Sequence, residues 1–164
     1  MFKLKPIMKE AVPRALERAE RYRLLNEPAE AESICRDVLE IEPGNRNALI
    51  TLLLSLTDQF AEGVTVDQAQ ELLPRLVDKY EGAYYAGIIC ERWAKAQMNH
   101  GAPGSGFVAH DWFHEAMAWY EKAQAVRPAG NDDAILRWNT CARILMKDPN
   151  LKPGPEERSV DLLE

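Results

Sequence analysis

Residues 30–45 read EAESICRDVLEIEPGN, and residues 115–131 read EAMAWYEKAQAVRPAGN. In each stretch an alanine precedes a proline by twelve residues: Ala31 precedes Pro43, and Ala116 precedes Pro128. Between the alanine and the proline, apolar side chains recur at the spacing of one helical face. The proline then stands where it ends a helix. The same unit, written twice in one chain, predicts a helical repeat.

A further helix is predicted directly before the first of these stretches. Ala15, Ala19 and Tyr22 share one helical face. Turn-forming residues then follow at 26–28. The next helix, at about residues 29–41, is expected to bury Ala31, Ile34, Cys35, Val38 and Leu39. The helix, the short turn, the second helix and the proline together occupy about 34 residues.

These features resemble the tetratricopeptide repeat (TPR), whose pattern of about 34 residues is W-x2-L-G-x2-Y, then A-x3-F, then P. Ala15 replaces the usual tryptophan and Arg18 the usual leucine. The small residues matter most, because they let paired helices approach closely. The matching positions in this first repeat, residues 12–45, are Ala19, Tyr22, Ala31, Cys35 and Pro43.

The resemblance continues with departures in a second repeat, residues 46–80. Ala69 and Leu73 keep the A-x3-F spacing. Pro74, however, falls inside the expected second helix and should kink it.

A third repeat is predicted at residues 81–130, with Gly87 as its small residue. The distance from Pro43 to Pro128 exceeds two periods of about 34 residues. We attribute the excess to a flexible, glycine-rich connection around residues 99–110. A terminal helix at 132–147 is expected to cover the end of the array. Close helix contacts are predicted at Ala19, Ala31, Gly87 and Ala116.

The predicted fold is all-α: a TPR-like right-handed superhelix of antiparallel helix pairs, with about seven helices in one domain, residues 1–148. A generic helical bundle with merely amphipathic spacing is the alternative. Residues 149–164 are predicted to form a stiff proline-rich spacer and an acidic tail. The end of this tail is interpreted either as disordered or as a plug for the groove, with acidic flanks that meet Arg23 or Arg143.

The composition is 46% hydrophobic and 28% charged, which is ordinary for a globular protein. The net charge is −6 and no cluster of lysine and arginine occurs, so nucleic acid is not an expected partner. No apolar stretch is long enough to span a bilayer, which predicts no membrane insertion and a cytoplasmic location. Three widely spaced cysteines, Cys35, Cys90 and Cys141, are expected to be buried free thiols.

The TPR resemblance implies that the first helix of each repeat lines a concave groove that binds a peptide or protein segment. The register assigns to this groove Leu16, Glu20, Arg23, Ile50, Leu54, Asp58, Tyr84, Ile88, Asn139 and Arg143. The surface is apolar in the middle and charged at its edges, so an apolar segment is the expected ligand. Glu20 would repel a C-terminal carboxylate, the ligand that some relatives bind.

The predicted function is therefore non-catalytic protein–protein interaction, as an adaptor, scaffold or assembly factor that needs no cofactor. A small chaperone for an aggregation-prone or secreted client is a related alternative. A metal-dependent enzyme is an alternative of another class, because His110 and His114 lie one helical turn apart. No third ligand follows at a defined spacing, so no metal site is predicted. A homo-oligomer whose groove is filled by a second copy is also open.

Overall fold

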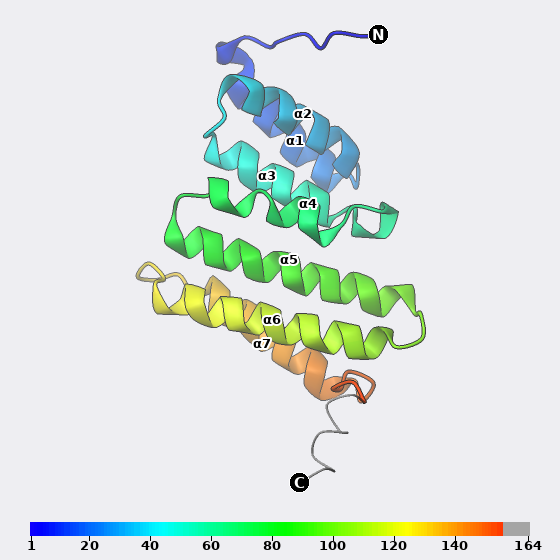
Figure 1. The fold of residues 1–164 in the computed structure, drawn as a ribbon. Helices are drawn as coiled ribbons and strands as arrows, with labels where there is room; N and C mark the ends of the chain where they lie inside the picture. Colours follow the sequence, from blue (N-terminus) through cyan, green and yellow to red (C-terminus); the bar gives the residue numbers. More distant parts are fainter. Residues whose placement is uncertain (156–164) are drawn as a thin grey trace. The chain divides into compact units, whose positions relative to one another are not determined.

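The computed structural model describes residues 1–155 of the chain. Their regular structure is entirely helical, with seven α-helices, so the all-α prediction is confirmed (Figure 1). The chain divides into two compact units, Met1–Leu76 and Val77–Glu164. Each unit is described by itself.

The first unit begins with two helical hairpins that share a helix. Pro28 starts its second α-helix, because a proline at this position loses no intrahelical hydrogen bond. The Asn45 side chain caps the third helix by accepting a hydrogen bond of 2.9 Å from the backbone N–H of Ala48. The elements are η1 (Lys9–Ala11), α1 (Val12–Leu24), α2 (Pro28–Ile41) and α3 (Arg46–Thr57).

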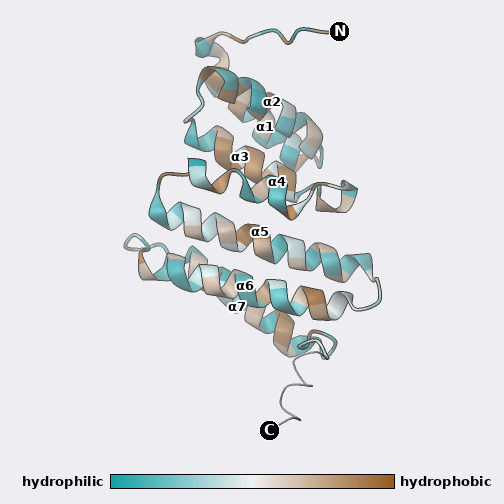
Figure 2. Ribbon diagram, viewed as in Figure 1, coloured by the Kyte–Doolittle hydropathy of each residue, from teal (hydrophilic) through white to brown (hydrophobic). Residues whose placement is uncertain are grey.

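Small residues lie at the contact of α1 with α2, as predicted. Ala19 and Ala31 are both completely buried, and Cys35 and Val38 of α2 join them. The helix α3 is the most apolar segment of this unit (Figure 2). It buries Leu49, Leu52, Leu53 and Leu56. The core of the first unit therefore lies between α1, α2 and α3.

The kinked helix predicted around Pro74 does not form. The helix α4 (Val66–Gln70) ends before the proline, which instead stands in the short 3-10 turn η3 (Leu73–Arg75). Proline cannot supply the backbone N–H of a continuing helix, and here the helix ends. Ala69 is still completely buried, so the segment packs against the core without being a full helix. It follows α3 by way of η2 (Phe60–Glu62).

The second unit consists of α5 (Lys79–His100), α6 (Ser105–Ala125) and α7 (Asp133–Lys147). The flexible connection predicted at 99–110 is wrong, because only residues 101–104 separate α5 from α6. Gly101 and Gly104 make this turn with φ angles of 69° and 81°, a region that favours glycine. Ala109 and Phe113 are completely buried, so hairpin packing holds the start of α6 in helical form.

The helices α5 and α6 pack closely at Gly87, the predicted small residue. A Cβ atom at this position would lie 2.6 Å from Cδ1 of Tyr120, well inside van der Waals contact. The Tyr120 ring is completely buried, as is Ala116 one turn before it. The glycine therefore makes room for the tyrosine ring between the helices.

Residues 149–155, predicted to form an extended, stiff spacer, lie in part against the second unit. Leu151 is buried, and the backbone of Asn150 lies against Gly106 on α6. A Cβ at Gly106 would lie 2.5 Å from the carbonyl oxygen of Asn150. This segment is thus docked on the second unit. The predicted plug at 156–164 lies outside the described residues.

Candidate functional site

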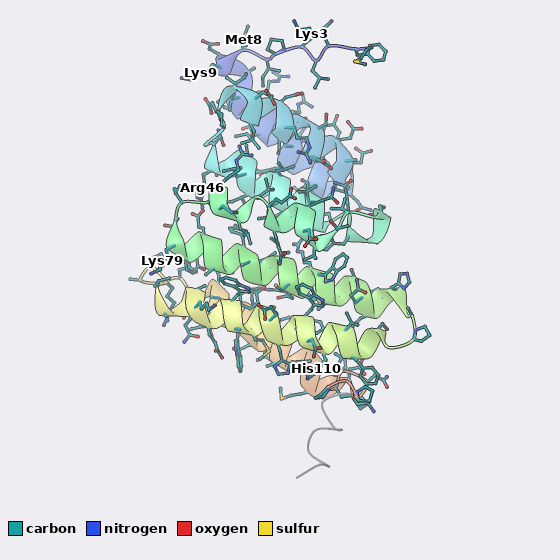
Figure 3. The ribbon with its side chains drawn as sticks, in the orientation of Figure 1. Lys3, Met8, Lys9, Arg46, Lys79 and His110 are labelled. Carbon is teal, nitrogen blue, oxygen red and sulfur yellow. The ribbon has the colours of Figure 1, made fainter. Side chains whose placement is uncertain are left out.

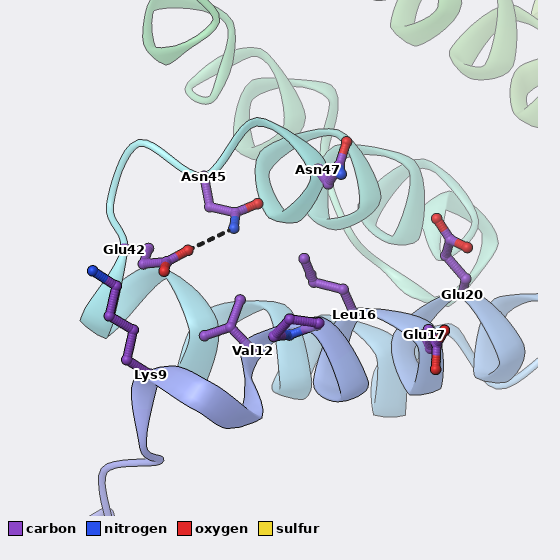
Figure 4. A pocket seen from close by; sticks show the side chains of 9 residues that line it. Lys9, Val12, Leu16, Glu17, Glu20, Glu42, Asn45 and Asn47 are labelled. Carbon is purple, nitrogen blue, oxygen red and sulfur yellow. Dashed lines mark hydrogen bonds between the residues drawn. The ribbon is translucent and has the colours of Figure 1, made fainter.

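A hollow of about 510 Å³ lies between the start of α1 and the start of α3 in the first unit (Figure 4). Leu16 rises between the two helices, and Lys9 and Glu42 stand at one end. Glu17 and Glu20 stand at the other end. The residues that line it are Lys9, Val12, Pro13, Leu16, Glu17, Glu20, Glu42, Asn45 and Asn47.

A second hollow of about 300 Å³ adjoins the first, because Glu20 lines both. Its residues are Glu20, Arg23, Leu24, Ile50, Thr51 and Leu54. We call the two hollows together the α1–α3 groove. Packing of α1 and α3 thus brings together five of the residues predicted to line a binding groove: Leu16, Glu20, Arg23, Ile50 and Leu54.

The α1–α3 groove has an apolar floor. Leu16, Ile50 and Leu54 are each partly exposed, so their side chains are available to a ligand. They are spaced along α1 and α3 at positions that face each other. Burial of such side chains against a partner contributes about 25 cal/mol for each Å² of apolar surface. The floor can therefore supply affinity for an apolar segment.

The charges around this floor are mostly negative. The Glu42 carboxylate accepts a hydrogen bond of 2.8 Å from the Asn45 side chain, and Lys9 lies at the same end. Glu17 and Glu20 make no ion pair within the residues that the structure describes. The middle of the groove is consequently electronegative.

Arg23 does not relieve this negative charge, because it is held by Asp58. The Arg23 Nε donates to Asp58 Oδ2 at 2.6 Å, and Nη2 donates to Oδ1 at 3.1 Å. Both residues were predicted to face the groove, and the structure pairs them with each other. Arg23 is therefore already neutralised, which disfavours the interpretation that it meets an acidic flank of the tail.

The groove residues predicted in the second unit are dispersed. Ile88 is 7% exposed, so it is a core residue and not a surface for a ligand. Tyr84 stacks on Tyr80 with ring centroids 5.7 Å apart. Burial, then the charge of Asp133, raises the pKa of Tyr84 to about 12. Asn139 is partly exposed and Arg143 exposed on α7.

A buried ionic cluster in the second unit was missed from the sequence. Glu91 on α5 is 1% exposed and accepts hydrogen bonds from two neighbouring helices. The Tyr120 hydroxyl donates to its Oε1 at 2.9 Å, and Lys95 Nζ donates to its Oε2 at 2.7 Å. Arg137 on α7 donates to both oxygens, from Nε at 3.1 Å and from Nη2. The cluster ties α5, α6 and α7 together through one carboxylate.

The protonation of this cluster follows from its geometry. Burial alone would raise the pKa of Glu91, but hydrogen bonds from Arg137 and Lys95 hold it below its ordinary value. Burial and the charge of Glu91 raise the pKa of Tyr120 far above its ordinary value. Glu91 is thus ionised and Tyr120 protonated at neutral pH. Because these donors already occupy the carboxylate oxygens of Glu91, this residue is better suited to holding the three helices together than to catalysis.

The two histidines of the metal-enzyme alternative do lie together on α6. The rings of His110 and His114 are 4.4 Å apart between centroids. His110 Nδ1 lies 3.0 Å from a carboxylate oxygen of the exposed Asp111. Within residues 1–155, however, no group of three or more potential ligands is placed to hold a metal ion.

The three cysteines are free and buried, as predicted. Burial raises the pKa of Cys35 and of Cys90 to about 12. The pKa of Cys141 is raised as well, first by burial and then by the charge of Glu91. All three are therefore protonated at neutral pH and unreactive as nucleophiles.

No family model matches the chain, and no curated protein shows significant similarity to it. Among the helices formed by residues 1–155, none combines the length and the apolar character needed to cross a membrane.

Proposed function

We propose that the protein is a non-catalytic protein-interaction module that binds a peptide or protein segment in the α1–α3 groove. The observation that carries the proposal is this groove, with its apolar floor at Leu16, Ile50 and Leu54. An apolar concave surface on a helical scaffold favours a ligand that buries side chains in it. Adaptor, scaffold and assembly-factor roles all use such a surface.

We further propose that the hairpins are TPR-like. In support, α1 and α2 pair through the small residues Ala19 and Ala31. Gly87 and Ala116 occupy the corresponding positions of α5 and α6, and Gly87 lies in direct contact with Tyr120, one turn after Ala116. In TPR-like hairpins the first helix faces the ligand, and α1 and α3 are the first helices of the two predicted repeats in this unit.

The charges of the groove define the ligand more narrowly. Glu17 and Glu20 would repel an acidic segment and attract lysine or arginine. The proposed ligand is therefore an extended segment in which apolar side chains occupy the floor and basic side chains meet the carboxylates. The acidic sequence EERSVDLLE of residues 156–164 has the wrong charge for this groove.

A peptide selection tests this function. The full chain, immobilised, is used to select from a phage library of random eight-residue peptides, and the selected peptides are synthesised for fluorescence anisotropy. We expect them to combine leucine, isoleucine or phenylalanine with lysine or arginine. The substitution Ile50→Glu should weaken their binding at least about tenfold, because a charge in an apolar floor must be desolvated.

The matched control is Leu136→Glu, which places the same charge at an exposed apolar position on α7. It should leave the affinity unchanged. Selection of no peptide, selection of acidic peptides, or equal effects of the two variants would each contradict the proposal.

A further inference from the structure

The first eight residues of the chain, MFKLKPIM, are all exposed except Ile7, which is partly exposed. They precede the first helical turn, and the stretch from Met8 past Lys3 is drawn apart from the helices (Figure 3). Phe2 is fully exposed, Leu4 is 83% exposed and Met8 is 67% exposed. Several large apolar side chains gathered on one short exposed segment favour a surface that another molecule covers.

This segment has the composition that the α1–α3 groove requires. Apolar and basic residues alternate in it, with Phe2 and Leu4 next to Lys3 and Lys5. In an extended chain, successive side chains point to opposite sides. Phe2 and Leu4 therefore share the side that would face the floor. The two lysines leave from the other side, and their flexible four-carbon stems let the ammonium groups reach the exposed carboxylates at the edge.

The charges and the dimensions of segment and groove also correspond. The lysines match Glu17 and Glu20, which make no ion pair within the described residues. Eight extended residues span roughly 26 Å at about 3.3 Å per residue. The α1 helix of 13 residues, along which the groove runs, rises about 20 Å at about 1.5 Å per residue. One segment is thus long enough to occupy both hollows.

We propose that residues 1–8 of one copy of the chain dock in the α1–α3 groove of a second copy. Within a single copy the segment joins Lys9 at one end of its own groove, and the chain leaves Lys9 on the side away from Leu16 (Figure 4). Its side chains remain exposed there, so its own groove does not cover them. Two copies that exchange their segments form two identical contacts and close as a symmetric dimer. The segment then competes with any other ligand of the groove.

Sedimentation equilibrium of the full chain, with two charge-reversal variants, tests this dimer. We expect a monomer–dimer equilibrium that shifts towards monomer as the salt concentration rises. The variants Lys3→Glu/Lys5→Glu and Glu17→Lys/Glu20→Lys should each raise the dimer dissociation constant at least about tenfold, because like charges then face each other. An equimolar mixture of the two variants should restore dimers, since both segments then meet a groove of opposite charge.

A control variant, Lys147→Glu/Lys152→Glu, reverses two exposed charges far along the chain and should dimerise like the wild type. Circular dichroism verifies that every variant is helical. A wild-type chain that is monomeric at all concentrations, or a mixture that fails to restore dimers, overturns the inference. Protection of Phe2 from protease that does not depend on concentration would show docking within one copy and would also overturn it.

The inference rests on the proposed function, because it uses the same groove, but the two fail separately. If selected peptides bind the groove while the wild-type chain stays monomeric, the dimer is wrong and the groove stands. If the chain dimerises but the charge-reversal variants do not change the dimer dissociation constant, and if no peptide binds the groove, then both the dimer and the proposed function are wrong.

Discussion

Gly87 is the residue on which the α5–α6 contact depends most directly. In an exposed helix, replacing glycine by alanine stabilises by about 1 kcal/mol. Here the added methyl would overlap the Tyr120 ring, which is buried and whose hydroxyl is held by Glu91. The ring cannot move aside without breaking that hydrogen bond.

We therefore predict that Gly87→Ala destabilises the protein by about 1–3 kcal/mol, the usual cost of overpacking. Urea denaturation followed by circular dichroism measures this. Gly44→Ala is the control, because a Cβ there has no atom within 4 Å. The control should change the free energy of unfolding by less than about 0.5 kcal/mol. Equal effects at the two glycines would show that this contact is not tight.

Glu91 is the residue whose titration should matter to stability. Its pKa in the folded state is held below the ordinary value of 4.5, since hydrogen bonds from Arg137 and Lys95 outweigh its burial. A carboxylate with a lowered pKa stabilises the fold fully above its ordinary pKa. That contribution is lost as the pH falls below about 4.5 through the folded-state pKa.

Glu91→Gln should accordingly cost about 3 kcal/mol at neutral pH. This is the lower end for a broken buried ion pair, because Arg137 and Lys95 still reach water. The stability difference between wild type and variant should shrink as the pH falls from 6 towards 3. Denaturation at a series of pH values measures it, with the exposed Glu115→Gln as the control. A difference that is constant with pH would contradict the ionised cluster.

At the scale of elements, the segment that follows α7 is held by its contact with the start of α6. The backbone of Asn150 lies against Gly106, and Leu151 is buried beside it. Gly106→Ala would push the Asn150 carbonyl away and expose Leu151. Thermolysin, which cleaves before leucine, should then cut the variant at residue 151 at least about tenfold faster than the wild type, because cleavage follows the population of the opened segment.

Gly154→Ala serves as the matched control, because its added Cβ would meet only ordinary contact, 3.9 Å from Phe107. It should be cleaved at the wild-type rate. Equal cleavage of wild type and Gly106→Ala would mean that the segment is not docked.

The elements that the sequence predicts well are those with local signals. Pro28 marks the start of α2, Pro43 marks its end, and Asn45 marks the start of α3. The structure places each of these boundaries within two residues of the marking residue. The glycines at 101–106 also signalled a break, but the burial of Ala109 and Phe113 extends the helix through part of that stretch. Tertiary packing there outweighs local preference.

The part of the candidate site that lies on α1 and α3 could also be predicted from local sequence signals. The residues of α1 and α3 were predicted because a helical register fixes which of them share a face. The Glu91 cluster was not, because Arg137 lies 46 residues away along the chain and nothing near Glu91 in sequence indicates its partner. Ile88 was assigned to the groove from the helical register alone. The register shows which residues share a helix face, but it does not show whether another helix covers that face.

At the scale of the whole molecule, the net charge of −6 adds to the local charge of the groove. A basic ligand is then steered towards an acidic protein, and salt screens this attraction over about 8–10 Å at physiological ionic strength. We predict that the association rate of a selected basic peptide falls several-fold between 50 and 500 mM NaCl. The dissociation rate, set by the apolar floor, should change less. Stopped-flow anisotropy separates the two rates, and an association rate that rises with salt would contradict the charge complementarity.

The most direct measurement of the role of the groove is a methyl NMR titration of the full chain with a selected peptide. Leu16, Ile50 and Leu54 lie on the floor of the α1–α3 groove, and Leu136 is an exposed leucine on α7 that serves as the internal control. We predict that the methyl signals of the three floor residues shift in a saturable way and that those of Leu136 do not. Saturable shifts at Leu136 with unmoved signals on the floor would contradict the assignment of the α1–α3 groove as the binding site.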